Sequence, residues 1–179
     1  TPPKKTLLQG QFYTRISQGT ISPLTATVRA REVRTPRGET DHAVFISCDL
    51  LSEDFREDLI TKVEGRCCGL NPEKMTINCT HTHTAPPVRS GWYPEPENDP
   101  EFMTPDAYRG WLTDRLAAAV AAAWQGRRPG SISRGFGFAV VGRCRRATYL
   151  DGSAQMYGDT DQDDFAGLEA CDDHAVNFL

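Results

Sequence analysis

The sequence lacks several features that would place a protein in a class at once. No apolar run approaches the roughly 20 residues that a membrane-spanning helix needs. Positive charge is not in excess, because the 179 residues carry a formal net charge of -4, which argues against nucleic acid as the main partner. Hydrophobic residues make up 39% of the chain, so the composition is that of an ordinary globular domain with its own core.

Cysteine pairs and two common catalytic motifs are missing too. None of the six cysteines forms a C-x-x-C pair, which disfavours a zinc ribbon, and the chain is too large to need a disulfide framework. We therefore expect free thiols. The chain also has no G-x-S-x-G nucleophile motif and no glycine loop that would cradle a phosphate. Serine hydrolases and nucleotide-binding proteins are disfavoured on these grounds.

The two ends of the chain favour a fragment. The sequence begins at Thr1 rather than at a methionine, and it stops inside the apolar run 175–179. This run is typical of a strand, and a strand with nothing after it suggests that the natural polypeptide continued. We expect residues 1–179 to be the amino-terminal portion of a larger, truncated domain.

Strand and helix signals alternate in the first half of the chain. Two strands are expected at 25–33 and 43–48, joined by a turn, and the second is apolar throughout, which is typical of a strand covered on both faces. Ser52 is expected to cap a helix with an apolar stripe that ends at Gly69. A strand at 75–79 follows, so the order predicts a crossover unit in an α/β fold: a layered mixed β-sheet with flanking helices.

The second half continues with a loop, a long helix and short strands. The loop 84–103 is rich in proline and aromatic residues, which is typical of a binding loop. Thr104 is expected to cap a helix that ends at Gly126. A strand is expected at 131–141, and the sequence 148–156 predicts a hairpin with a two-residue type I′ turn.

The segment Thr80-His81-Thr82-His83 is the strongest chemical signal. In an extended backbone, His81 and His83 would point to the same side, as two metal ligands or as one ligand and one proton carrier. Asp49 follows the neighbouring strand, and it would either orient a ligand histidine or simply begin the helix. Zinc suits nitrogen and oxygen ligands of this kind, but a catalytic zinc needs about three protein ligands and only two are evident here.

Three further residues are weaker candidates. Arg145 and Arg146 would bind an anion or stabilise an oxyanion, or they would be solvated residues at the end of a strand. His174 would supply a third ligand, or it would be a surface histidine.

Several stretches together resemble one family, the neutral/alkaline non-lysosomal ceramidases and their bacterial relatives. The most specific stretch is Thr80-His81-Thr82-His83, within a longer match over 78–86. The supporting stretches are 1–3, 47–50, 141–146 and 172–176. The resemblance covers most of this chain but only the amino-terminal part of the family's catalytic domain.

This resemblance implies a zinc-dependent amidohydrolase that cleaves the N-acyl bond of ceramide. His81 would be a zinc ligand, His83 would contact the reacting group, and Arg145, with Arg146 as the alternative, would hold the substrate or the oxyanion. The other ligands, a histidine, a glutamate and a tyrosine, are expected beyond Leu179, and His174 is not the second zinc histidine in this alignment. The implied partners are a lipid or acyl-amide substrate, the membrane surface and the rest of the catalytic domain, in a secreted or periplasmic location.

The sequence departs from the family beside the histidines. Thr84-Ala85 stands where the family has Ser-Gly, and the loop 86–103 is also unlike that of the ceramidases. Both changes fall at the expected substrate entrance. Two alternatives to a ceramidase are therefore a hydrolase of the same metal type that acts on another amide or ester, and a non-catalytic fragment that lacks the remaining ligands.

Overall fold

The computed structural model describes residues 1–179 as a mixed α/β fold with two compact units, 1–128 and 129–179. The first unit contains β1 (Ala26–Arg34), β2 (Thr40–Cys48), α1 (Arg56–Val63), a 3-10 turn (Pro72–Lys74), β3 (Met75–Cys79) and α2 (Pro105–Gln125). The second contains β4 (Gly135–Phe138), β5 (Arg146–Tyr149), β6 (Ala154–Met156), β7 (Phe165–Leu168) and β8 (Ala175–Phe178). Each unit is described by itself below.

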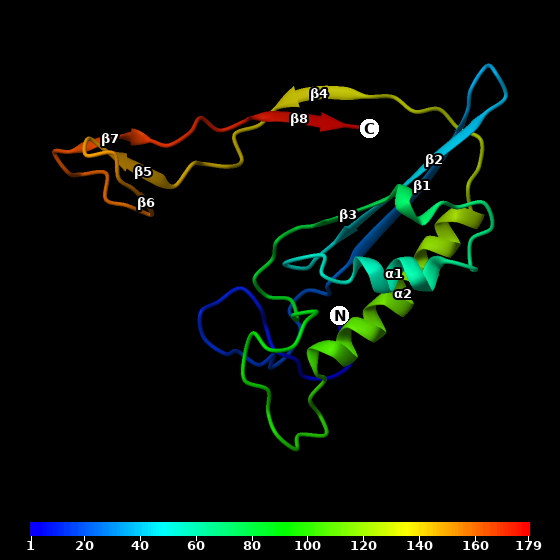
Figure 1. Ribbon diagram of the computed structural model, residues 1–179, viewed down its shortest axis with the longest axis horizontal. Helices are drawn as coiled ribbons and strands as arrows, with labels where there is room; N and C mark the ends of the chain where they lie inside the picture. The colour runs from blue at the N-terminus through cyan, green and yellow to red at the C-terminus, as the bar shows by residue number, and fades with distance from the viewer. The chain divides into compact units, whose positions relative to one another are not determined.

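The sheet of the first unit has the strand order β1-β2-β3 (Figure 1). β1 and β2 form an antiparallel hairpin, and its turn is closed by a hydrogen bond of 2.9 Å from the Gly38 amide to the Thr35 carbonyl. β2 and β3 are parallel, which confirms the predicted crossover through α1. The sheet is therefore mixed, as the sequence predicts, and the carboxyl ends of β2 and β3 lie together at one edge.

The prediction that β2 is covered on both faces is wrong. Val44, Ile46 and Cys48 are buried in the core with residues of both helices, whereas the side chain of Phe45 between them is 42% exposed. Successive side chains of a strand point to opposite faces, so the core covers only one face of the sheet. An unbroken apolar sequence is therefore compatible with a strand that is covered on one face as well as with a strand that is covered on both.

The predicted bounds of α1 are wrong at both ends. The helix begins at Arg56, one turn later than a Ser52 cap requires, and the hydroxyl of Ser52 donates to the Asp54 carboxylate instead. Phe55 lies at the N-cap position and is 1% exposed, so the need to bury its ring decides how the chain enters the helix. The helix ends at Val63 because Gly65 takes a left-handed conformation with φ of 77°, well before Gly69.

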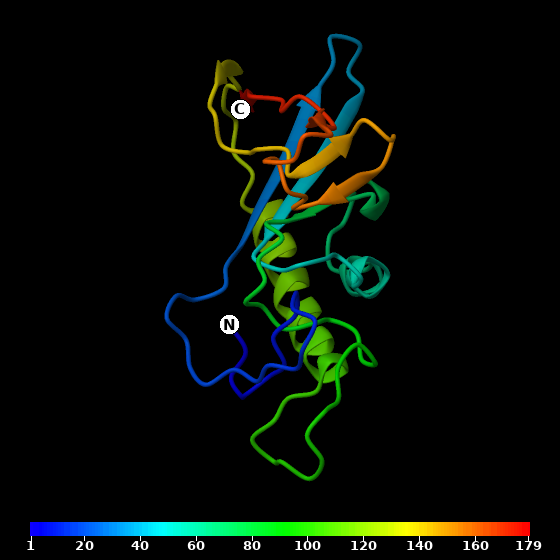
Figure 2. The ribbon, with the colours of Figure 1, turned by 90° about the vertical axis from the view of Figure 1, so that its left-hand side faces the viewer.

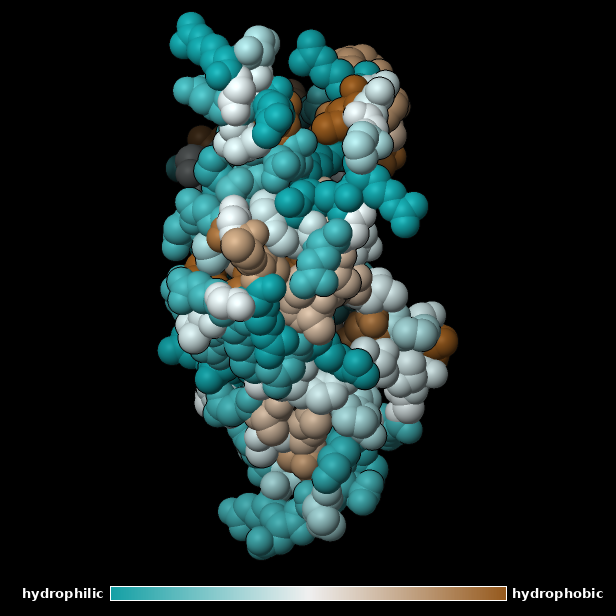
Figure 3. Space-filling model, turned by 90° about the vertical axis from the view of Figure 1, so that its right-hand side faces the viewer, coloured by the Kyte–Doolittle hydropathy of each residue, from teal (hydrophilic) through white to brown (hydrophobic).

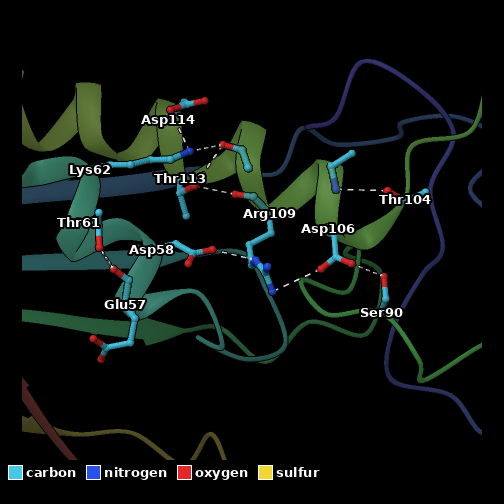
Figure 4. Close-up of polar contacts among 12 residues, drawn as sticks. Glu57, Asp58, Thr61, Lys62, Ser90, Thr104, Asp106, Arg109, Thr113 and Asp114 are labelled. Carbon is cyan, nitrogen blue, oxygen red and sulfur yellow. Dashed lines mark hydrogen bonds and ion pairs between the residues drawn. The ribbon is translucent and has the colours of Figure 1, made fainter.

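The helix α2 begins and ends where the sequence predicts. The hydroxyl of Thr104 accepts a hydrogen bond of 3.2 Å from the Ala107 amide, and Gly126 follows the last helical residue. Ion pairs join α2 to α1, as Figure 4 shows: Lys62 contacts Asp114 at 2.9 Å, and Arg109 contacts Asp58 at 2.8 Å. The two helices also share an apolar core, and the ion pairs are partly exposed. The pairs therefore set the position of one helix against the other rather than supply most of the stability.

The second unit consists of short antiparallel strands. β4 pairs with β8, and the other three strands form a sheet in the order β6-β5-β7. The predicted strand 131–141 is reduced to β4, because its partner β8 offers only four residues for pairing. Ala147 is the only buried hydrophobic residue of this unit, so backbone pairing rather than a core holds it together.

The hairpin between β5 and β6 forms, but its predicted turn type is wrong. A type I′ turn needs positive φ at two successive residues, whereas only Gly152 has positive φ, 83°, in this connection. The Tyr149 amide donates to the Ser153 carbonyl at 3.0 Å, which leaves three residues in the loop. The Asp151 carboxylate accepts from the Ser153 amide at 2.8 Å and stabilises this longer turn.

The face in Figure 3 is mostly hydrophilic, with apolar residues in small separate patches, which is usual for a folded domain. Neither helix has the length and apolar character to cross a bilayer, in keeping with the absence of a transmembrane segment expected from the sequence.

Candidate two-histidine site

The ends of β2 and β3 bring the candidate residues of the first unit together. Cys48 and Cys79 are partners in the parallel register, and the Thr80 amide extends the ladder by donating to the Cys48 carbonyl at 2.9 Å. Asp49 and Thr80 therefore leave the sheet side by side, as the sequence predicts. The loops 1–25 and 84–103 gather at one end of this unit in both Figure 1 and Figure 2.

His81 is not in the extended conformation that the sequence analysis expects. Its φ is 59°, which is left-handed, because the chain turns sharply as soon as β3 ends. Its Nδ1 lies 3.0 Å from the Leu51 carbonyl oxygen. A carbonyl only accepts, so Nδ1 carries the proton and the lone pair of the neutral ring lies on Nε2. This is the arrangement in which protein histidines usually bind metals.

The ring of His83 lies next to that of His81. Their centroids are 5.2 Å apart and the ring planes cross at 72°. The turn at His81 thus brings the two rings together in place of the extended backbone. Gly10 makes room for His83: a Cβ on Gly10 would lie 2.5 Å from the His83 Cγ and 2.8 Å from its Nδ1. The imidazole of His83 makes no hydrogen bond, so both of its nitrogens are free to act.

Arg15 and Tyr93 are site residues that sequence reasoning missed. The guanidinium of Arg15 donates to the His83 carbonyl oxygen, and it also reaches the Gln9 carbonyl at 3.4 Å. The Tyr93 hydroxyl accepts from the Gly10 amide at 3.1 Å and donates to the Gln11 carbonyl at 2.7 Å. The contact of Arg15 with His83 spans 68 residues of sequence and that of Tyr93 with Gly10 spans 83, so no local pattern could have indicated them.

The carboxylate of Asp49 hydrogen-bonds residues next to the ends of β1 and β3 rather than a histidine. It accepts from the Thr25 hydroxyl at 2.7 Å, from the Thr25 amide at 2.9 Å and from the Thr80 hydroxyl at 3.3 Å. These hydrogen bonds, those from Thr25 first, hold the pKa of Asp49 below its usual value. Because Thr80 precedes His81, Asp49 can affect the histidine only by fixing the backbone before it.

Substituting Asp49 tests this role through pH. A lowered native pKa stabilises the fold above the unfolded pKa of about 3.9, and that contribution is lost as pH falls through the native pKa. We expect Asp49→Asn to lower stability by about 1 kcal/mol at pH 6 and to lose less further stability between pH 5 and pH 2 than the wild type. Urea unfolding at each pH measures this, with Glu64→Gln as the control because the Glu64 side chain makes no polar contact. Parallel pH profiles for wild type and Asp49→Asn would contradict the assignment.

Two thiols stand at the ends of the strands that lead to the site. Cys48 and Cys79 end β2 and β3, and burial raises the pKa of Cys48 to about 12 and that of Cys79 to about 11. At neutral pH they are protonated and pack as small apolar groups, not as thiolate ligands. All six cysteines are free thiols. The side chains of His, Cys, Asp and Glu form no group of three or more that could hold a metal ion.

The remaining sequence candidates belong to the second unit. The Arg145 guanidinium stacks 4.9 Å from the ring of Tyr157 and donates to the hydroxyl of that residue at 2.7 Å. Arg146 pairs with Glu169 at 2.9 Å. The carbonyl of His174 accepts from the Ala139 amide at 2.9 Å, while its Nδ1 is buried without a partner. These contacts all lie within the second unit.

A pocket of about 640 Å³ lies over the amino-terminal segment of the first unit. Lys5, Leu8 and Leu24 line it, together with Thr84 and Pro86. Neither histidine lines the pocket, but Thr84 follows His83 directly. The space therefore begins beside the histidine pair without containing it.

The chain was compared with protein-family models, curated proteins and solved structures. None of the three comparisons found a match.

Proposed function

We propose that this chain carries the amino-terminal part of the active site of a zinc-dependent amidohydrolase. The observation that supports it is the His81 ring, whose Nδ1 is held by the Leu51 carbonyl so that Nε2 is presented beside His83. Imidazole nitrogen is a preferred donor for zinc, and a backbone acceptor on the opposite ring nitrogen strengthens such a ligand. The donor set fits zinc in part, since one or two ligands are present where a catalytic site needs about three.

Each residue of the site has a distinct task in this proposal. Bound zinc would supply a water whose pKa falls to about 7, the nucleophile for amide hydrolysis. His81 holds the metal, and His83, with both ring nitrogens free, exchanges a proton with the reacting amide or donates a hydrogen bond to its carbonyl oxygen. Arg15 fixes the His83 backbone, and Asp49 fixes the turn before His81.

The other parts of the site follow from the family resemblance. It supplies the remaining ligands from polypeptide beyond Leu179 and gives Arg145 the task of holding substrate or oxyanion. Ceramide is the substrate that it implies. Another amide or an ester would use the same residues, and hydrolysis of labelled ceramide against simple acyl amides and esters separates these substrates.

Zinc titration by calorimetry tests the metal assignment. We expect the wild type to bind one zinc weakly, and His81→Ala to weaken that binding about tenfold or more because the presented Nε2 is lost. His42→Ala is the matched control and should leave the affinity unchanged, since the Nε2 of His42 already accepts from the Asn71 amide at 2.9 Å and His42 lies at the opposite end of β2 from Cys48. Equal zinc affinity in the wild type and His81→Ala would rule out His81 as a ligand.

A further inference from the structure

Cys48 and Cys79 stand directly opposite each other on neighbouring strands. They are register partners in the parallel pair of β2 and β3, which run side by side in Figure 1. Partners in a ladder point to the same face of the sheet, and here that face is the core. Cys48 is 2% exposed within the core, and Cys79 is partly buried and packs against it. Two free thiols therefore share one side of one register position.

The backbones of this pair are already at the spacing that a disulfide bond needs. Neighbouring strands lie about 4.7–4.9 Å apart, and the Cα atoms of bridged cysteines are about 4.4–6.8 Å apart. The ladder holds this spacing on both sides, through the Ile46–Ile77 pair before it and the Thr80 amide after it. Burial and then the neighbouring Cys79 raise the pKa of Cys48 to about 12, which places the two thiols within electrostatic reach of each other. Closing a bond between the two sulfur atoms requires side-chain rotation and no change of register.

No other two cysteines are placed in this way. The adjacent residues 67–68 follow α1, where the Cys68 carbonyl accepts from the Trp124 indole at 3.0 Å. The Trp124 ring contacts His42 at a centroid distance of 5.1 Å, and His42 is about 20 Å along β2 from Cys48. The remaining cysteines belong to the second unit. The pair at the ends of β2 and β3 is therefore the one that the fold of the first unit brings together.

We propose that Cys48 and Cys79 form a reversible disulfide that joins β2 to β3 when the chain meets a disulfide oxidant such as glutathione disulfide. The Cys79 thiol, the more exposed of the two, gives up its proton and attacks one sulfur of the oxidant, which releases one glutathione and leaves a mixed disulfide. The Cys48 sulfur then attacks the Cys79 sulfur and releases the second glutathione, which takes up the Cys48 proton. The protein thiols lose two electrons and two protons, and glutathione disulfide is reduced to two thiols.

The bond would lie at the point where the chain leaves the sheet for the histidine pair. Asp49 and Thr80 follow the two cysteines directly and are joined by a hydrogen bond of 3.3 Å. Oxidation therefore links covalently the two strand ends that position His81. It also closes the segment 48–79, which contains α1, into a ring, and this restricts the unfolded chain more than the folded one. The inference concerns the thiols alone, so it stands whether or not His81 binds zinc.

Oxidation of the full chain under native conditions tests the pair. The wild type is incubated with glutathione disulfide, the remaining thiols are alkylated, and the digested chain is analysed by mass spectrometry without reduction. Because burial slows the first attack, the reaction is followed until the amount of linked peptide is constant. We expect a linked peptide pair that contains Cys48 and Cys79. We also expect the midpoint of thermal unfolding to rise by about 5–10 °C and to fall back after reduction.

Three single variants identify the partners. Cys48→Ala and Cys79→Ala should each form no linked peptide and show no rise of the midpoint on oxidation. Each variant is compared with its own reduced form, so that any change in packing cancels. Cys68→Ala is the control, because Cys68 is exposed and follows α1, and it should behave like the wild type. The absence of a linked peptide, a link that joins other cysteines instead, or an equal rise of the midpoint in Cys48→Ala would overturn the proposal.

Discussion

Replacing Phe55 with alanine should lower the free energy of unfolding of the first unit by about 3–5 kcal/mol. The ring is 1% exposed and packs in the main core, at the residue where the chain enters α1. Its removal leaves a cavity at a point that the backbone cannot easily close. A loss of this size is a large share of the 5–15 kcal/mol that holds a typical domain folded.

Phe45→Ala is the matched control for this prediction. It removes the same side chain from β2, but the ring is 42% exposed, so we expect a cost of about 1 kcal/mol or less. Urea unfolding followed by tryptophan fluorescence measures both variants, because Trp92, Trp111 and Trp124 all lie in the first unit. Equal losses for the two variants would show that Phe55 is not the buried anchor of the helix.

Gly10→Ala should be the most damaging small substitution at the site. The new methyl group would lie 2.5 Å from the His83 Cγ and 2.8 Å from its Cβ. These atoms are next to the His83 backbone, so a change of rotamer cannot move both of them away. The φ of Gly10, 103°, adds strain for any residue with a side chain. We expect a loss of about 2 kcal/mol or more in stability and a displaced His83 ring, seen as shifted imidazole resonances.

Substitutions at two other glycines separate the steric contact with His83 from the backbone strain. Gly38 also has positive φ, 85°, but a Cβ there meets nothing within 4 Å, so Gly38→Ala measures backbone strain alone. Gly19→Ala has neither problem and should be nearly neutral. If Gly10→Ala behaves like Gly38→Ala and leaves the His83 resonances in place, the contact between the loop 9–15 and His83 does not exist in solution.

Local sequence signals predicted the bounds of the elements that have capping or turn residues at their ends. α2 is correct at both ends because Thr104, Pro105 and Gly126 each act on the backbone next to them. β3 is correct because the 3-10 turn that begins at Pro72 leads directly into it. At α1 the same kind of signal failed, because burial of Phe55 outweighed a cap by Ser52.

The candidate site was predictable only in its residues and not in its geometry. The spacing of His81 and His83 predicted two rings on one side, but the backbone achieves this through a left-handed turn rather than an extended strand. The acceptor for His81 is Leu51, a backbone group that no side-chain motif can indicate. Arg15 binds His83 across 68 residues of sequence and Tyr93 binds Gly10 across 83, and only the fold brings such residues together.

The two bonds of the Tyr93 hydroxyl couple the motions of the loops that flank the histidines. When this hydroxyl leaves its place, the Gly10 amide and the Gln11 carbonyl lose their partner in the same event. We therefore expect local opening of the loop 84–103 and of the loop 9–15 to be cooperative, which hydrogen exchange of the Gly10 amide in wild type and Tyr93→Phe would measure.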